Sequence, residues 1–183
     1  MTSKIDFLKI VSAHWKTLHH SASKNVSKSD IVLFYVAPAG IAAVLVWVLN
    51  RNLTTNAVNF LATIFSIFVG LLLNLLVIII GQLPKKDEPK KGEPKESPSQ
   101  ATLTNYRDRL LEETFSNISY SILVSVILIV LLFLSRLTSG VLLQIASAIS
   151  FAFVGNFLLT LLMILKRVDS ILNREIPNHG QLR

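Results

Sequence analysis

Long uncharged, apolar segments alternate along the chain with shorter segments that carry most of its charge. Four segments contain no charged side chain: residues 31–50, 52–84, 114–135 and 137–165. Each supplies the roughly 20 residues with which a helix crosses about 30 Å of hydrocarbon. The strands of a β-barrel would instead alternate apolar and polar side chains over about ten residues. We therefore expect four transmembrane helices, at residues 31–49, 57–80, 118–134 and 141–165.

This pattern predicts an all-α, polytopic integral membrane protein whose helices form two hairpins, residues 31–80 and 118–165. A water-soluble domain would need amphipathic surface to cover four apolar helices, and the remaining residues are too few to supply it. The two hairpins also match each other without a gap. The offset that aligns Tyr35 with Tyr120 also aligns Arg51 with Arg136, and it aligns residues 68–70 with residues 153–155. We expect a parallel internal repeat.

The charged segments that flank the spans have helical periodicity of their own. Apolar residues recur every three to four positions through residues 103–117, which predicts a cytoplasmic helix that runs into the third span. Residues 166–183 extend the fourth span as a helix until Pro177 stops it, and a tail follows. Residues 1–30 hold an amphipathic helix and a linker. That helix either lies on the inner membrane surface or caps the two cytoplasmic extensions.

Residues 81–102 form a strip that is rich in Lys, Glu, Pro and Ser. Such a composition offers too little apolar surface to offset the entropy of folding, so we expect a disordered cytoplasmic linker. Its simplest role is a hinge between the two hairpins. A docking tail and a contact with anionic lipid remain alternatives.

Positive charge is distributed unevenly between the two sides of the predicted spans. All of the 18 Lys and Arg residues except Arg51 and Arg136 lie on one side. The positive-inside rule places that side, with both termini, in the cytoplasm. The aromatic residues Trp15, Tyr35 and Tyr120 are expected to anchor the chain at the membrane interface.

Small residues recur at helical spacing within the spans. They are Ala39, Ala43, Ala62, Ser66, Gly70, Ala148, Ala152 and Gly155. Lipid provides no hydrophobic driving force between helices, so small residues hold membrane helices together by allowing their backbones to approach closely. We expect these residues to form the helix-packing faces, toward either a helix of the same chain or another copy.

The polar side chains that the spans carry do not ionise. The main candidates are Asn59, Asn74, Gln144, Asn156 and Thr160. A proton relay or an ion-coupled carrier is expected to place a charged residue at depth, and these spans hold none. We therefore expect hydrogen bonds between helices, with a hydrated cavity as the alternative for Asn74 and Asn156.

The sequence holds no set of residues typical of an active site or a cofactor site. It lacks a Ser, His and acid set, a phosphate-binding glycine loop and paired carboxylates. His14, His19 and His20 are not spaced to share one helical face as metal ligands. The net charge of +7 is explained by the cytoplasmic segments, and no basic stripe is interleaved with aromatic residues. We expect no enzyme activity, no metal or cofactor, and no direct binding of nucleic acid.

Three segments resemble the membrane component of Kiwa anti-phage systems, the KwaA-type proteins. They are "KSDIVLFYVAPAGIAAVLVW", "LATIFSIFVGLLLNLLVI" and "YRDRLLEETFSNISYSILVSVILIVLLFL". The resemblance covers about residues 28–176. It implies a homo-oligomeric, tetrameric sensor in the bacterial inner membrane that recruits a soluble, DNA-binding partner of the KwaB type in the cytoplasm. The two cytoplasmic extensions would be the docking surface, with the charged candidates Arg107, Arg109, Glu112, Glu113, Arg167, Arg174 and Glu175.

Two other classes of protein remain open. An oligomeric pore or holin-like protein would depolarise the cell, with Asn74, Ser150, Asn156 and Thr160 along its lumen. A carrier of small solutes is disfavoured by the charge-free spans. The cytoplasmic extensions could also pair with each other and dock no partner.

Overall fold

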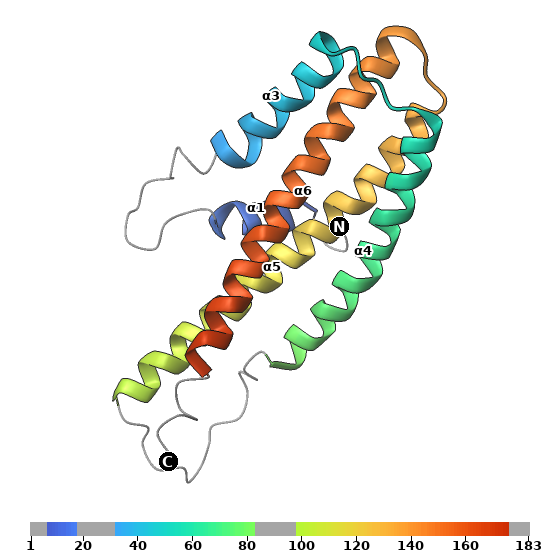
Figure 1. Ribbon diagram of the computed structural model, residues 1–183. Helices are drawn as coiled ribbons and strands as arrows, with labels where there is room; N and C mark the ends of the chain where they lie inside the picture. The colour runs from blue at the N-terminus through green and yellow to red at the C-terminus, as the bar shows by residue number, and fades with distance from the viewer. Residues whose placement is uncertain (1–6, 18–31, 83–97, 176–183) are drawn as a thin grey trace, which may run out of the picture.

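A computed structural model describes residues 7–17, 32–82 and 98–175, and every regular element in these ranges is a helix (Figure 1). The all-α prediction is therefore confirmed for the described part of the chain. The elements are α1 (Phe7–Thr17), the consecutive helical stretches η1 (Val32–Val36), α3 (Ala37–Ala43) and η2 (Val44–Val48), then α4 (Thr55–Gln82), α5 (Pro98–Ser135) and α6 (Gly140–Glu175).

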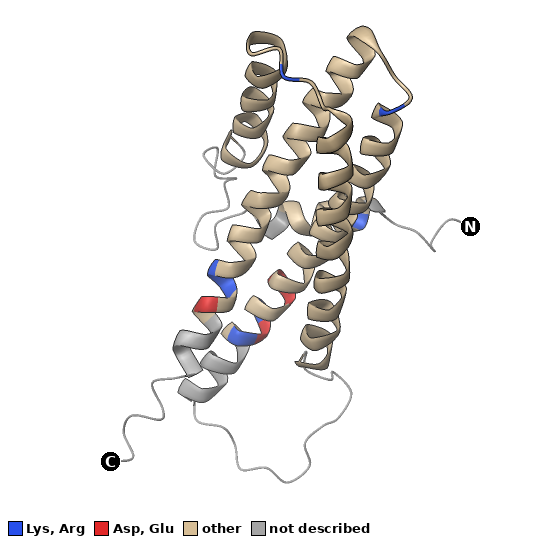
Figure 2. Ribbon diagram, turned by 45° about the vertical axis from the view of Figure 1, so that its right-hand side comes forward, with Lys and Arg blue, Asp and Glu red and all other residues tan. Residues whose placement is uncertain are grey.

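Helices α4, α5 and α6 each contain a segment long and apolar enough to cross a membrane, and Val32–Val48 is a shorter apolar helix. Figure 2 shows the charged residues of α5 and α6 at one end of the bundle and two further charges on the connecting turns at the other end, with an uncharged stretch between. Arg51 and Arg136 lie at the end where the connecting turns are, and the charges of α5 and α6 lie at the other end. The chain thus has the character of a membrane protein.

Helix α5 begins at Pro98, within the segment that was expected to be a linker. Proline is well suited to the first turn of a helix, because its missing N–H would have no intrahelical acceptor there. Helices α5 and α6 continue without a break from the turn at their outer end into the charged segments 103–117 and 166–175. Residues 1–6, all of residues 18–31, residues 83–97 of the expected linker and the tail after Glu175 lie outside the described residues.

The first expected hairpin is not a packed hairpin. The helices lie in the order α3, α6, α5, α4, with the closest backbone approaches between neighbours in this order (Figure 1). Phe65 of α4 also reaches Phe157 of α6, with the two ring centroids 4.8 Å apart. The segment after Leu49 crosses the first turns of α6, near Ser147, instead of turning back on η2. Leu53 is buried there, and its backbone N–H donates to Ser147 Oγ at 3.0 Å. The central pair α5 and α6 therefore separates the two helices that are adjacent in sequence.

The buried face of α5 contains serine and threonine residues that were not among the predicted packing residues. On α5, residues at alternating spacings of three and four are all buried: Leu111, Thr114, Ile118, Ser121, Ser125, Leu128, Leu132 and Ser135. This is the spacing at which two helices interlock side chains along a shared seam. The hydroxyl of Ser125 donates to the backbone carbonyl of Ser121 at 2.8 Å, so burying this side chain does not leave its hydroxyl donor without a partner.

The predicted packing residues divide between buried and exposed positions. Ala148 is buried, and Ala62, Ala43, Ala152 and Gly155 are half-buried. Ala39, Ser66 and Gly70 are exposed, and a Cβ added to Gly70 would meet nothing within 4 Å. Of the two alternatives, packing within the chain therefore does not apply to these three residues. In α4 the buried face is formed by Val58, Phe65, Leu72 and Ile79 instead of Ser66 and Gly70.

Candidate functional site

Pro38 interrupts the backbone hydrogen bonding of the first apolar helix, and a side chain of α6 supplies the missing donor. A proline has no N–H, so the carbonyl of Phe34 loses its usual donor four residues on. The side chain of Asn156 on α6 supplies one, because its Nδ2 donates to the Phe34 carbonyl oxygen at 3.0 Å. Gly155 allows this approach, since a Cβ at that position would lie 2.9 Å from Pro38 Cβ. Pro38, Gly155 and Asn156 thus form one joint between α3 and α6.

Tyr120 connects this joint to α5. Its hydroxyl donates to Asn156 Oδ1 at 3.0 Å, so both ends of the Asn156 amide are bonded and the side chain ties three helices together. Tyr120 is only 7% exposed. Its expected role as an interfacial anchor is therefore wrong: the ring lies in the core because its hydroxyl has a buried partner.

His14 extends the network to α1. Its ring stacks on Tyr120 with a centroid distance of 3.8 Å and an interplanar angle of 3°. Its Nδ1 lies 2.8 Å from Asn117 Oδ1, which places the ring proton on Nδ1 as the donor. Both His14 and Asn117 have no exposed surface. A continuous series of side-chain contacts therefore links α1, α5 and α6 to the Pro38 joint.

A second aromatic contact joins α1 to the first apolar helix. Trp15 stacks on Tyr35 with a centroid distance of 5.5 Å and an interplanar angle of 21°. Trp15 keeps 42% of its surface exposed, which is compatible with the position expected of it at the membrane interface. Between these contacts lies a cavity of about 140 Å³ whose lining includes Tyr35, Pro38, Tyr120 and Asn156.

The charged candidates on the extensions of α5 and α6 have two different environments. Glu113 pairs with Arg109 at 3.1 Å on its own helix and with Arg167 of α6 at 3.3 Å. Arg167 also donates to the backbone carbonyl of Glu113 at 3.2 Å. Burial lowers the pKa of Arg167, and Glu113 opposes this effect. Glu113 and Arg167 therefore fasten the two extensions to each other.

Arg107 and Glu112 lie on the exposed side of α5, and the Arg109 side chain is 55% exposed. These three side chains are thus accessible at the surface of the single chain. Arg174 and Glu175 belong to the last turns of α6, but their side chains lie outside the described residues.

The remaining polar candidates are not collected at one site. Thr160 is buried, and its hydroxyl donates to the Asn156 backbone carbonyl at 2.9 Å. Asn59 accepts a bond from Arg136 Nη1 at 3.0 Å near the outer end of the bundle. Gln144 is half-buried, and Asn74 is exposed on α4. Within the residues that the structure describes, no three His, Cys, Asp or Glu side chains are placed to hold a metal ion.

Sequence reasoning did not assign His14 and Asn117 to the site. His14 follows Val11 by three residues, so helical periodicity places it beside the apolar face of the N-terminal helix. Asn117 lies three residues before Tyr120 and shares its face of α5. Spacing alone could identify both faces as inward, but only the packing of α1 on α5 brings the two side chains together.

Comparison with protein-family models, curated proteins and solved structures finds no match to this chain. The function is therefore argued from the arrangement of its own residues.

Acidification is expected to release α1 from the bundle. The pKa of His14 is lowered from 6.5 to about 4, mainly by burial; the bond to Asn117 opposes this shift, and the nearby charge of Arg167 adds to it. The docked ring stays neutral, whereas a released ring takes up a proton below pH 6.5. The docking of α1 is therefore strongest above pH 6.5. As the pH falls from 6.5 to about 4, the free energy of docking becomes less favourable by about 1.4 kcal/mol per pH unit.

The change can be followed by Trp15 fluorescence, since Trp15 leaves Tyr35 when α1 is released. His14→Phe keeps a ring on Tyr120 but cannot titrate, so its signal should stay flat over the same pH range. An identical pH profile in both proteins would show that another group controls the docking of α1.

Proposed function

We propose that this chain is a non-enzymatic sensor and scaffold subunit of the bacterial inner membrane, with four spans and both termini in the cytoplasm. The observation that carries the proposal is the continuity of α5 and α6 from the outer turns to the charged extensions. Two unbroken, mutually packed helices transmit a displacement at one end to the other. The ion pair between Glu113 and Arg167 keeps the extensions in register at the cytoplasmic end.

In this proposal the shorter apolar helix Val32–Val48 completes the set of four spans and is the first of them along the chain. At about 1.5 Å per residue it covers most of the roughly 30 Å of hydrocarbon, and it packs along α6. The offset that relates the two halves of the sequence also relates the first residue of α4, Thr55, to the first residue of α6, Gly140. This agreement supports a parallel repeat of sequence and helix boundaries, although the two halves pack differently.

The resemblance to KwaA-type proteins gives this scaffold a place in anti-phage defence. In this proposal, the chain responds to attack at the envelope and recruits a soluble, DNA-binding partner to the exposed side of the α5 extension. The network from Asn156 to His14 supports such a role, because it couples the Pro38 joint to α1 on the cytoplasmic side.

Removing the exposed charges of α5 is expected to abolish partner binding. Arg107→Ala combined with Glu112→Ala changes two exposed side chains without touching the pair of Glu113 and Arg167. Co-purification of the protein encoded by a neighbouring gene, from cells that express both, should fall at least about tenfold if each charge contributes about 1 kcal/mol. The control Lys166→Ala removes an exposed charge from α6. Undiminished co-purification of the double variant would contradict the docking surface.

A second copy of the chain is proposed to cover the outer face of α4. Ser66, Gly70 and Asn74 lie there at four-residue spacing, and all three are exposed. An amide that faces hydrocarbon is costly, and a bond to Asn74 of another copy would remove the cost. Asn74→Leu should lower the fraction of cross-linked oligomer several-fold in native membranes, by about 1 kcal/mol per interhelical bond. Unchanged cross-linking would place the interface elsewhere.

A pore is the competing function. Ser150, Asn156 and Thr160 are buried within a single chain, so they are not placed to line a lumen between copies. Only Asn74, of the suggested lumen residues, has an exposed side chain. Expression of the chain alone should leave the membrane potential unchanged if it is a scaffold, and should collapse the potential if it is a pore.

A further inference from the structure

A pocket between α1 and α5 lies at the boundary between the charged and apolar parts of the bundle. It is lined by Lys9, Ile10, Ala13, Phe115, Ser116 and Ser119 and has a volume of about 230 Å³. On α5 it begins directly after Glu112 and Glu113, the last acidic residues before the apolar stretch. In a membrane-spanning chain this is the level of the inner-leaflet headgroups.

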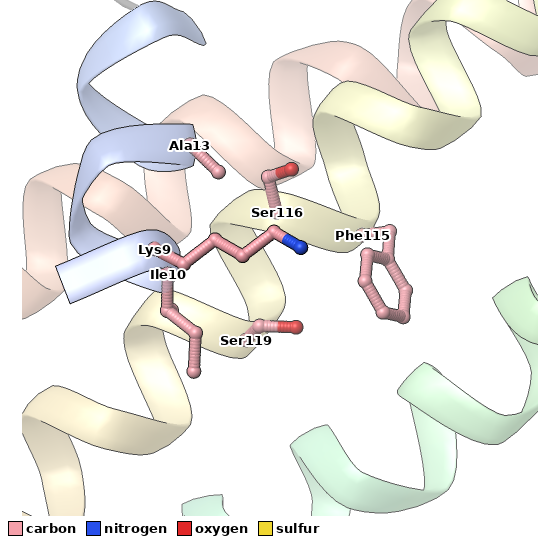
Figure 3. A pocket seen from close by; sticks show the side chains of 6 residues that line it. All are labelled: Lys9, Ile10, Ala13, Phe115, Ser116 and Ser119. Atoms are coloured by element: carbon pink, nitrogen blue, oxygen red, sulfur yellow. The ribbon is translucent and has the colours of Figure 1, made fainter. Parts of the chain in front are cut away.

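The polar side chains of the pocket are one cation and two hydroxyls. Figure 3 shows the Lys9 side chain extending from α1 across the pocket, with its amine toward the side where Ser116 and Phe115 lie. Lys9 takes part in neither ion pair found among the described residues, which join Glu113 to Arg109 and to Arg167. The Ser116 hydroxyl donates to the Glu112 carbonyl at 3.1 Å, so its oxygen remains near the pocket while its proton is engaged. Ser119 can donate a hydroxyl proton to an anion.

The remaining walls are apolar. Ile10 and Ala13 come from α1, and the ring of Phe115 comes from α5. Pockets for whole drug-sized ligands begin at roughly 300 Å³, so this pocket accepts only part of a larger amphipathic molecule. A molecule with one anionic group and an apolar continuation fits this lining. At this level of a membrane, that molecule is a phospholipid.

We propose that this pocket binds the phosphate of an anionic phospholipid of the inner leaflet, with Lys9 as the cation, Ser119 as a donor and Phe115 against the start of an acyl chain. The proposal depends on the membrane placement in the proposed function but not on the partner or on defence. Bound lipid would join α1 to α5. Lipid charge would then act together with His14 to hold α1 in place.

Native mass spectrometry of the detergent-solubilised chain tests this proposal. The full-length protein is exchanged into equal amounts of phosphatidylglycerol and phosphatidylcholine, and the lipids retained per chain are counted. The wild type should retain phosphatidylglycerol preferentially. Lys9→Gln should lower that preference about fivefold, as expected for one Lys charge near an anionic membrane surface.

Lys166→Gln is the matched control, because Lys166 is an exposed lysine at the same end of the bundle but does not line the pocket. An equal loss in the two variants, or no loss in Lys9→Gln, would overturn the site. Ser119→Ala supplies a second variant that leaves the charge of α1 unchanged and should also reduce retention. Displacement of the lipid by millimolar inorganic phosphate would show that the site takes a free anion and not a lipid.

Loss of lipid selectivity with intact partner co-purification would remove this site and leave the scaffold proposal standing. Circular dichroism of each variant reports whether the helices have formed. If Lys9→Gln does not fold, Ser119→Ala decides the outcome.

Discussion

Replacing Asn156 by leucine is expected to destabilise the bundle by roughly 2–5 kcal/mol, because two buried groups lose the hydrogen bond that each makes to this side chain. The Phe34 carbonyl would lose the donor that stands in for the missing N–H of Pro38, and the Tyr120 hydroxyl would lose its acceptor. Leucine has a similar volume, so the loss comes from hydrogen bonding and not from a cavity. The measurement is the midpoint of unfolding in mixed micelles of increasing sodium dodecyl sulfate, followed by circular dichroism.

Asn74→Leu is the matched control for this experiment. It makes the same chemical change on an exposed face of α4, so the stability of the single chain should not fall. The unfolding midpoint of Tyr120→Phe should lie between those of the two asparagine variants, since this change removes the hydroxyl bond to Asn156 and keeps the ring stacked on His14. Equal losses for Asn156→Leu and Asn74→Leu would mean that the Asn156 bridge contributes nothing specific.

Replacing Gly155 by alanine is expected to cost about 1–3 kcal/mol, the usual penalty for overfilling a packed site. The added Cβ would lie 2.9 Å from Pro38 Cβ. A proline ring is fixed to the backbone, so it cannot rotate away, and α3 must move from α6. The same movement would lengthen the bond from Asn156 to the Phe34 carbonyl. Gly155→Leu should separate the helices further and lower the unfolding midpoint more than alanine does.

Gly40→Ala controls for this change on the other side of the joint. Gly40 lies on α3, and a Cβ there would meet nothing within 4 Å. Its replacement should leave stability unchanged or raise it slightly, because alanine favours helix over glycine by about 1 kcal/mol. If Gly155→Ala behaved like Gly40→Ala, the close contact of α3 with α6 at Pro38 would be wrong.

The two predictions also bear on function. Both loosen the joint that anchors the first apolar helix to α6, and neither touches the charged extensions. Under the proposed function, a variant that still binds the partner but no longer responds to a stimulus at the outer face would separate sensing from recruitment. A variant that loses partner binding as well would show that the joint is required for the shape of the extensions.

The sequence alone determined which segments are helical and apolar. Charged residues such as Arg51, Arg136 and Glu113 mark the limits of the uncharged segments, because a charge in hydrocarbon is costly. Periodicity and Pro177 likewise predicted that the third and fourth apolar helices continue into charged extensions, and α5 and α6 do so. These properties depend on the side chains of one segment at a time, so a linear pattern contains them.

Only the tertiary structure decided which faces meet. Lipid tails are as apolar as leucine, so hydrophobicity does not distinguish a buried face of a membrane helix from an exposed one. The shapes of the facing helices make that distinction, and they bury Ser121 and Ser125 of α5 while Ser66 and Gly70 of α4 stay exposed. The burial of Tyr120 depends on His14 and Asn156, which are distant in sequence and become its neighbours only when α1 and α6 pack against α5.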